Sequence, residues 1–172
     1  MATYYWVGGD GVWNTSGSHW SAATGKAITA SCSGSTLTVT AGTVVVGDEI
    51  WSNNNTYLGY VLSSLGGGQW SLSSSGTFSS QTMTAATTVA AAPTSADNVI
   101  FDANSGTANF GVTVQDAVCN NFTVSISTAG RLTFAFGVIY CYGTPTVNAA
   151  TTISVIIGGS STQLYLQRLL VQ

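Results

Sequence analysis

The stretch "CNNFTVSISTAGRLTF" (residues 119–134) contains two short runs in which apolar residues alternate with threonine and serine. The runs FTVSIS (122–127) and RLTF (131–134) are separated by the small-residue turn TAG (128–130). Strict alternation places apolar side chains on one face of a strand and hydroxyl side chains on the other. The stretch therefore predicts two neighbouring strands, each with one buried face.

Short runs of this kind, separated by turns of small residues, occur over most of the chain. Further strand candidates lie at 36–41, 98–102, 111–115, 137–143, 152–157 and 163–167, with Gly-, Ser- and Asn-rich clusters between them. Helix signals are nearly absent, and the alanine-rich segment 85–92, which stops at Pro93, is expected to be an extended linker. Short strands with such turns are typical of sandwiches, barrels and solenoids. We expect an all-β protein whose main part is an antiparallel β-sandwich resembling a jelly roll.

One weak internal similarity bears on the topology. Residues 119–134 and 141–155 can be aligned with Cys119 on Cys141, 22 residues apart. This interval fits either one coil of a β-solenoid or a hairpin pair in a sandwich, and the weakness of the match favours the hairpin pair. The two cysteines could form a bridge if their segments lie side by side. Buried thiols that pack as small apolar groups are the simpler interpretation.

Residues 27–86 form a self-contained run of about six short strands, and the sequence on either side of it has a different character. We therefore predict a host β-domain made of residues 1–26 and 87–172. Residues 27–86 are predicted to be a small, barrel-like β-module inserted into it.

The N-terminal stretch "YYWVGGDGVWNTSGSHW" (4–20) is dense in aromatic residues. Its tryptophans recur every seven residues, but its four glycines, Gly8, Gly9, Gly11 and Gly17, exclude a helix. We interpret this region as a structural plug over one end of a β-core, formed by Trp6, Trp13, Trp20 and Phe101. Alanine at Trp6 is expected to unfold the domain, and alanine at Trp51 is not.

Composition excludes several classes of protein. Of 172 residues only 5% are charged and 45% are hydrophobic, with a net charge of −3. Three basic residues cannot track a nucleic acid or bind an anionic membrane. The opening MATYYWVGGD has no secretory signal pattern, and no apolar run is long enough for a transmembrane helix. A surface with so few charges favours self-association.

Candidate catalytic groups are sparse. His19 is the single histidine, and Ser16 or Ser18 as nucleophile with Asp97 or Asp102 as orienting group would complete a triad, although no nucleophile elbow is present. The pairs Asp97–Asp102 and Asp48–Glu49 do not resemble an acid/base couple. The oxygen-bearing residues Asp10, Asn14, Asp97, Asp102 and Asn104 show no ordered calcium-ligand series. We therefore expect no enzyme, no cofactor and no metal site.

The loop "IWSNNNTYLGY" (50–60) is the first candidate for ligand contact, because it mixes aromatic rings with side-chain amides. Aromatic rings can stack on sugar rings, and amides can bind their hydroxyl groups. The candidate contact residues are Trp51, Asn53, Asn54, Tyr57 and Tyr60.

Two motifs resemble segments of β-rich surface proteins, in particular phage tail and virion proteins and bacterial adhesins of the autotransporter type. The first motif is Tyr-Trp-x-Gly-Gly, Gly-x-Trp-Asn and Trp-Ser, followed by Pro-x-x-x-Asp-x-Val-x-Phe-Asp. It is carried by Tyr5, Trp6, Gly8, Gly9, Gly11, Trp13, Asn14, Trp20, Ser21, Pro93, Asp97, Val99, Phe101 and Asp102.

The second motif resembles an element of phage tail proteins and lies within residues 27–86. It is carried by residues 37–40, 46–50, 66–68, 70–73 and 82–84. Together the two motifs cover roughly the first 100 residues.

The resemblance implies a bacteriophage virion protein at the outer surface of the particle, and a short chain of this kind fits a capsid decoration (cement) protein best. Its expected partners are the major capsid protein, other copies of itself in a homotrimer, and host-surface glycans. A tail or fibre component that binds the host receptor is the alternative within this class. A glycan-binding adhesin module is the alternative from another class.

Overall fold

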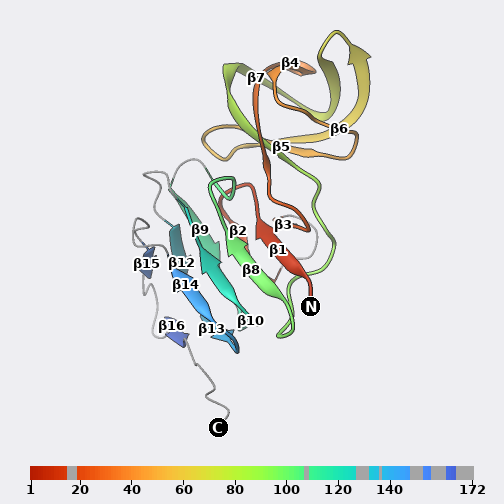
Figure 1. Cartoon of the computed structure of the whole chain (residues 1–172). Coiled ribbons are helices and arrows are strands. Elements are labelled where there is room, and N and C mark those ends of the chain that lie inside the picture. Colours follow the sequence, from red (N-terminus) through yellow and green to blue (C-terminus); the bar gives the residue numbers. More distant parts are fainter. Residues whose placement is uncertain are drawn as a thin grey trace.

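The computed structural model describes residues 1–14, 19–106, 109–126, 132–135, 137–147, 153–155 and 162–165. These residues form sixteen strands and include no helix, so the prediction of an all-β protein is confirmed. The strands belong to two parts of the molecule, which Figure 1 shows one above the other. The lower part contains residues from both ends of the chain, and the upper part is built from a central segment.

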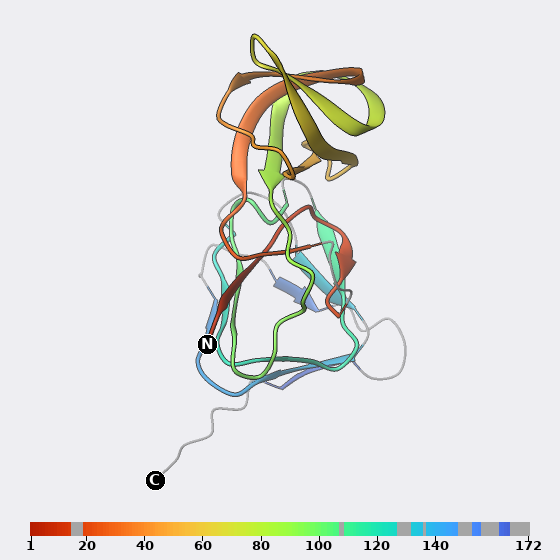
Figure 2. The same ribbon diagram turned by 90° about the vertical axis from the view of Figure 1, so that its right-hand side faces the viewer.

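Nine strands of the lower part form three successive coils of a parallel β-solenoid. The first coil contains β8 (Asn98–Phe101), β9 (Phe110–Thr113) and β10 (Ala117–Cys119). The second contains β11 (Phe122–Val124), β12 (Leu132–Ala135) and β13 (Gly137–Cys141), and the third contains β14 (Pro145–Val147), β15 (Ile153–Val155) and β16 (Thr162–Tyr165). Each strand pairs in parallel with the corresponding strand of the next coil. Figure 2 looks along the solenoid, whose three sheets enclose a triangular core.

The solenoid is therefore not the antiparallel sandwich that we expected. Phe122 and Val124 do point into the core, as the alternation predicts, and Leu132 and Phe134 do the same. Alternation reports only that one face of a strand is buried, which holds for parallel and antiparallel neighbours alike. The 22-residue interval between Cys119 and Cys141 is one coil, because the two residues are direct partners in the parallel ladder.

An incomplete coil closes the N-terminal end of the solenoid. β1 (Thr3–Trp6) continues the sheet of β8, and β2 (Gly11–Val12) continues the sheet of β9. β3 (Trp20–Ser21) then ends the first of these sheets by pairing antiparallel with β1. The backbone N–H of Val89 donates to the carbonyl of Trp20 (2.7 Å), so the segment returning from the upper part lies against this end.

The four residues interpreted as an aromatic plug are buried in one cluster at this end. Trp6, Trp13, Trp20 and Phe101 are each at most 1% exposed. The rings of Trp6 and Trp20 meet edge to face at 4.9 Å, and those of Trp13 and Trp20 at 5.0 Å. Offset and edge-to-face pairs of this kind stabilise a core beyond the area that they bury.

The upper part, here called the antiparallel module, contains four strands within residues 26–86. They are β4 (Lys26–Ala41), β5 (Glu49–Trp51), β6 (Tyr57–Gly66) and β7 (Gln69–Ala86). β7 pairs with β4 along one edge and with both β6 and β5 along the other, which coils the sheet around its own core. The residues on either side of the module meet in one sheet of the solenoid, through β1, β3 and β8.

Asp97 ties the N-terminus to the start of β8. Its Oδ1 accepts a hydrogen bond from the backbone N–H of Ala2 (2.8 Å), and its Oδ2 accepts from the hydroxyl (2.6 Å) and N–H (3.1 Å) of Thr94. The Thr94 hydroxyl and then the Ala2 N–H lower the pKa of Asp97 below its ordinary value, because they stabilise the carboxylate.

This lowered pKa predicts a loss of stability in acid. The unfolded chain takes up the Asp97 proton at a higher pH than the folded chain does, so unfolding is favoured as the pH falls from about 5 through the folded pKa. The Asp97→Asn variant should be less stable at neutral pH and should show a flatter melting temperature between pH 5 and pH 3. Parallel pH profiles for the two proteins would contradict this assignment.

Candidate functional site

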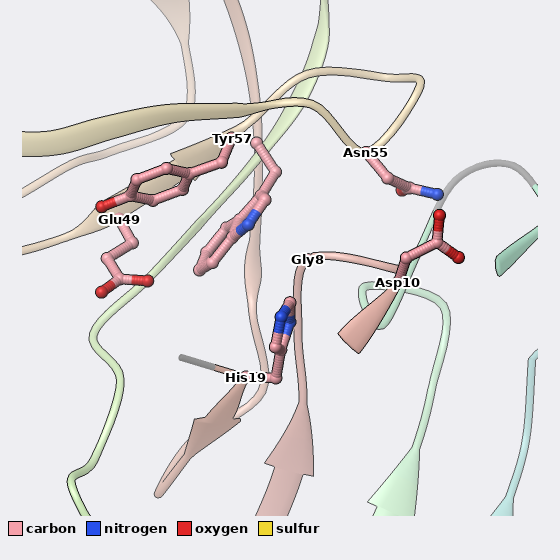
Figure 3. A pocket seen from close by; sticks show the side chains of 7 residues that line it. Gly8, Asp10, His19, Glu49, Asn55 and Tyr57 are labelled. Atoms are coloured by element: carbon pink, nitrogen blue, oxygen red, sulfur yellow. The ribbon is translucent and has the colours of Figure 1, made fainter. Parts of the chain in front are cut away.

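A cleft of about 400 Å³ lies where the antiparallel module meets the N-terminal turn of the solenoid. Its volume is in the range of small-ligand sites, roughly 300–1,000 Å³. It is lined by Gly8, Asp10, His19, Glu49, Trp51, Asn55 and Tyr57. In Figure 3, Glu49 and Tyr57 lie on one side of this junction cleft, Asp10 and Asn55 on the other, and His19 below and between them.

Two glycines let the two parts approach each other at the cleft. Gly8 and Gly9 both have positive φ angles, +85° and +82°, which L side chains rarely adopt. A Cβ on Gly8 would lie 2.4 Å from the ring of Trp51, and a Cβ on Gly9 would lie 2.4 Å from the side chain of Asn55. The sequence Gly8-Gly9 therefore determines how closely β5 and the following loop can pack on the turn.

The Gly8→Ala variant should lose about 2–4 kcal/mol of unfolding free energy, because strain at a positive φ adds to displacement of a buried ring. Thermal or urea denaturation measures this loss. Gly67 is the matched control, since its φ is also positive, +58°, while an added Cβ there meets nothing within 4 Å. If Gly8→Ala and Gly67→Ala lower the unfolding free energy by the same amount, the packing of Trp51 on Gly8 contributes nothing to stability.

His19 is held as a neutral structural residue on the floor of the cleft. Its Nδ1 lies 2.7 Å from the carbonyl oxygen of Val7, which requires Nδ1–H to donate. Its ring stacks on that of Trp6 with centroids 4.8 Å apart. Burial lowers the pKa of His19, while the Val7 hydrogen bond and the charge of Asp10 act against that effect.

The residues considered as triad partners of His19 have other roles. Asp97 binds Ala2 and Thr94, as described above, and the carboxylate of Asp102 accepts from the Thr24 hydroxyl (2.6 Å) and the Asn104 N–H (2.9 Å). Ser16 and Ser18 lie outside the described residues. The hydrogen bonds of Asp97 and Asp102 fix strand ends and turns, which is common for aspartate in such positions.

The wall formed by β5 and β6 carries an acidic group beside an exposed ring. Glu49 accepts a hydrogen bond from the Thr88 hydroxyl (3.1 Å), and burial raises its pKa above the ordinary value. Burial, together with the charge of Glu49, also raises the pKa of Tyr57. Tyr57 is 49% exposed and its ring lies 5.8 Å from that of Trp51. On the opposite wall, Asp10 Oδ1 accepts from the Gly111 N–H (2.6 Å).

Two of the five residues predicted for ligand contact line the cleft, namely Trp51 and Tyr57. Trp51 is only 3% exposed and packs with Val7 and Ala86. Its ring therefore supports the wall of the cleft and offers little surface to a ligand. Asn54 accepts hydrogen bonds from Ser52 and from Thr56 (3.0 Å) and shapes the turn.

The remaining three predicted contact residues, Asn53, Asn54 and Tyr60, do not line the cleft. The backbone N–H of Asn53 donates to Gln81 Oε1 (3.3 Å). Tyr60 is 45% exposed on β6, where it pairs with Glu49. The sequence did not predict that one cleft would be lined by Gly8, Asp10, His19, Glu49 and Asn55. Only the glycine pair signalled a close approach of two segments.

A second hollow runs along the outer face of the sheet that contains β1, β8, β11 and β14. Its volume is about 310 Å³, and its lining is rich in Thr and Asn side chains from successive coils: Thr3, Asn98, Ile100, Asn121, Thr123, Thr144 and Thr146. Asn121 Nδ2 donates to Asn98 Oδ1 (2.8 Å), and Asn121 Oδ1 accepts from the Thr144 N–H (2.7 Å). These amides bond to one another and to the backbone between coils, so their role is to hold the coils in register.

Within the described residues, no group of three or more His, Cys, Asp or Glu side chains is placed to hold a metal ion. That part of the chain also contains no helix that is long and apolar enough to cross a membrane.

No family model, no curated protein and no solved structure matches the chain. The class of the protein is therefore defined by its own architecture, a short parallel β-solenoid that carries an antiparallel β-module and a cleft at their junction.

Proposed function

We propose that the chain is a structural protein of a bacteriophage virion, a capsid decoration protein that binds the outer capsid surface as a homo-oligomer. A solenoid whose coils are joined by continuous parallel ladders is a stiff support. The antiparallel module projects from one corner of it and is free to contact a partner (Figure 2).

The observation that carries the proposal is an exposed apolar surface on the module. Val46, Tyr60, Leu62 and Leu65 are each at least 45% exposed. Val46 lies near Leu62, because Gly47 N donates to the carbonyl of Val61 (2.8 Å), and Tyr60, Leu62 and Leu65 follow one another along β6. Exposed apolar clusters on proteins with few charges are typical of association surfaces.

Counting copies tests this proposal against the tail or fibre alternative. A decoration protein should be present at on the order of hundreds of copies per virion, because it repeats with the capsid lattice. A tail or fibre component should number a few to a few dozen. Densitometry of purified particles, calibrated against the major capsid protein, separates the two. Absence of the chain from washed particles would overturn both.

A glycan-binding role is the second candidate, and the junction cleft is the observation that favours it. Tyr57 offers a half-exposed ring for stacking on a sugar, while Asp10, Glu49 and Asn55 offer acceptors and an amide for its hydroxyl groups. A lining with two carboxylates disfavours anionic sugars, so neutral or amino sugars are the expected ligands.

This candidate predicts that Tyr57→Ala and Glu49→Gln each weaken glycan binding by about tenfold or more, since each removes one stacking or hydrogen-bonding contact. Binding is measured on a glycan array and then by calorimetry with the best ligand. Tyr142→Ala is the matched control, because Tyr142 is a 56% exposed tyrosine of the solenoid, away from the cleft lining. An array without signal for the wild-type chain removes the candidate.

A further inference from the structure

Two cysteines of the solenoid face each other across consecutive coils. Cys119 ends β10 and Cys141 ends β13, and the two residues are direct partners in the parallel ladder. They are 0% and 1% exposed and belong to the same core, so both side chains point inward. The third cysteine, Cys32, is buried in the separate core of the antiparallel module.

The backbone after the pair holds the two coils in register. Tyr142 N donates to the carbonyl of Cys119 (3.0 Å), and Gly143 N donates to that of Asn120 (2.6 Å). Neighbouring strands lie about 4.8 Å apart, and disulfides span Cα separations of about 4.4–6.8 Å. A bond between the two sulfurs therefore requires rotation of side chains and no movement of one coil past the other.

The two thiols already interact in the reduced protein. The charge and side chain of Cys141 act on the Cys119 thiol, and Cys141 Sγ donates to the carbonyl of Asn120 (3.2 Å). Burial, reinforced by Cys141, raises the pKa of Cys119 to about 12. Because the thiolate is the reactive form, the pair is slow to oxidise at neutral pH while the solenoid is closed.

We propose that Cys119 and Cys141 are an oxidation site at which a disulfide joins the first and second coils. With a hydroperoxide as oxidant, one thiolate attacks a peroxide oxygen and becomes a sulfenic acid, and the second sulfur then displaces the sulfenic hydroxyl group as water. Two thiols lose two protons and two electrons, and one hydrogen peroxide becomes two waters. The site is reduced in a reducing cytosol and oxidises outside it, where the added cross-link stabilises the solenoid.

The experiment uses the full chain with Cys32→Ser, so that only the pair can react. After incubation with hydrogen peroxide, the peptides that carry Cys119 and Cys141 should be linked, with a combined mass about 2 Da lower than that of the two thiol forms, and alkylation under denaturing conditions should find no free thiol. Formation should be faster at pH 9 than at pH 7, and a reductant should reverse it. The melting temperature should rise by about 5–10 °C, as expected for closing a loop of one coil.

The variant Cys32→Ser/Cys141→Val is the matched control and should show neither the mass loss nor the rise in melting temperature. Refolding in a glutathione redox buffer tests the pair while the coils are open to solvent. Two free thiols after that refolding, or a gain of oxygen without a cross-link, would overturn the proposal. A cross-linked protein that melts lower than the reduced one would overturn the stabilising role.

Discussion

Replacing Trp6 with alanine should unfold the N-terminal end of the solenoid at room temperature or leave it only marginally stable. The indole is fully buried and stacks on Phe101 with ring centroids 5.6 Å apart. Its Nε1–H donates to the carbonyl of Gly9 (2.7 Å), inside the turn that forms the junction cleft. The substitution leaves a large cavity and an unpaired carbonyl, which together cost about 3–5 kcal/mol or more.

Two further variants separate the causes of this loss. Trp6→Phe keeps a six-membered aromatic ring but removes the hydrogen bond to Gly9 and part of the buried volume, so it should fall between wild type and Trp6→Ala. Trp51→Ala should also destabilise the protein, because Trp51 is 3% exposed, yet by less than Trp6→Ala, since it packs in a much smaller cluster. Melting curves and urea titrations measure all three. Equal losses for Trp6→Ala and Trp51→Ala would show that the plug is not the main support of this end.

The plug and many strands could be predicted from sequence because they depend on local patterns. Alternation at 122–127 and 131–134 marks buried strand faces, and dense aromatics among glycines mark a core that cannot be helical. The direction of strand pairing could not be predicted in this way. Parallel and antiparallel pairing bury the same residues. Few residues are shared between equivalent positions of successive coils, and Cys119 and Cys141 are one such pair.

The junction cleft could not be predicted because no local pattern contains it. Asp10 comes from the turn after β1 and His19 directly precedes β3, whereas Glu49 and Tyr57 come from the antiparallel module. Their proximity depends on how the module seats on the turn, which a spacing in the sequence does not encode. The neighbouring acidic residues Asp48 and Glu49 differ in their surroundings, because Glu49 lines the cleft and Asp48 is completely buried.

That burial makes Asp48 a sensitive position of the module. Its Oδ2 accepts from Lys26 Nζ and from the Val45 N–H (2.8 Å), and its Oδ1 accepts from the Thr87 hydroxyl (2.9 Å). These donors come from the start of β4, the loop before β5 and the segment after β7, so one carboxylate fastens the base of the module.

Asp48→Ala should therefore cost about 2–4 kcal/mol, somewhat less than breaking a fully buried ion pair, because Lys26 is 35% exposed and can regain water. Asp48→Asn retains an acceptor for Thr87 and should cost less. In a double-mutant cycle, Lys26→Met combined with Asp48→Ala should be more stable than the sum of the single losses implies. Strict additivity of the two losses would contradict a direct pair.

The region that loses structure distinguishes these variants better than the loss of unfolding free energy does, since each part of the molecule has its own core. Hydrogen exchange in Asp48→Ala should accelerate in β4, β5, β6 and β7, whereas in Trp6→Ala it should accelerate in β1, β3 and β8. Among the described residues, Val7, Trp51 and Ala86 form a separate buried cluster that is too small to couple the stabilities of the two cores fully. Uniform acceleration throughout the chain for either variant would mean that module and solenoid unfold as one cooperative unit.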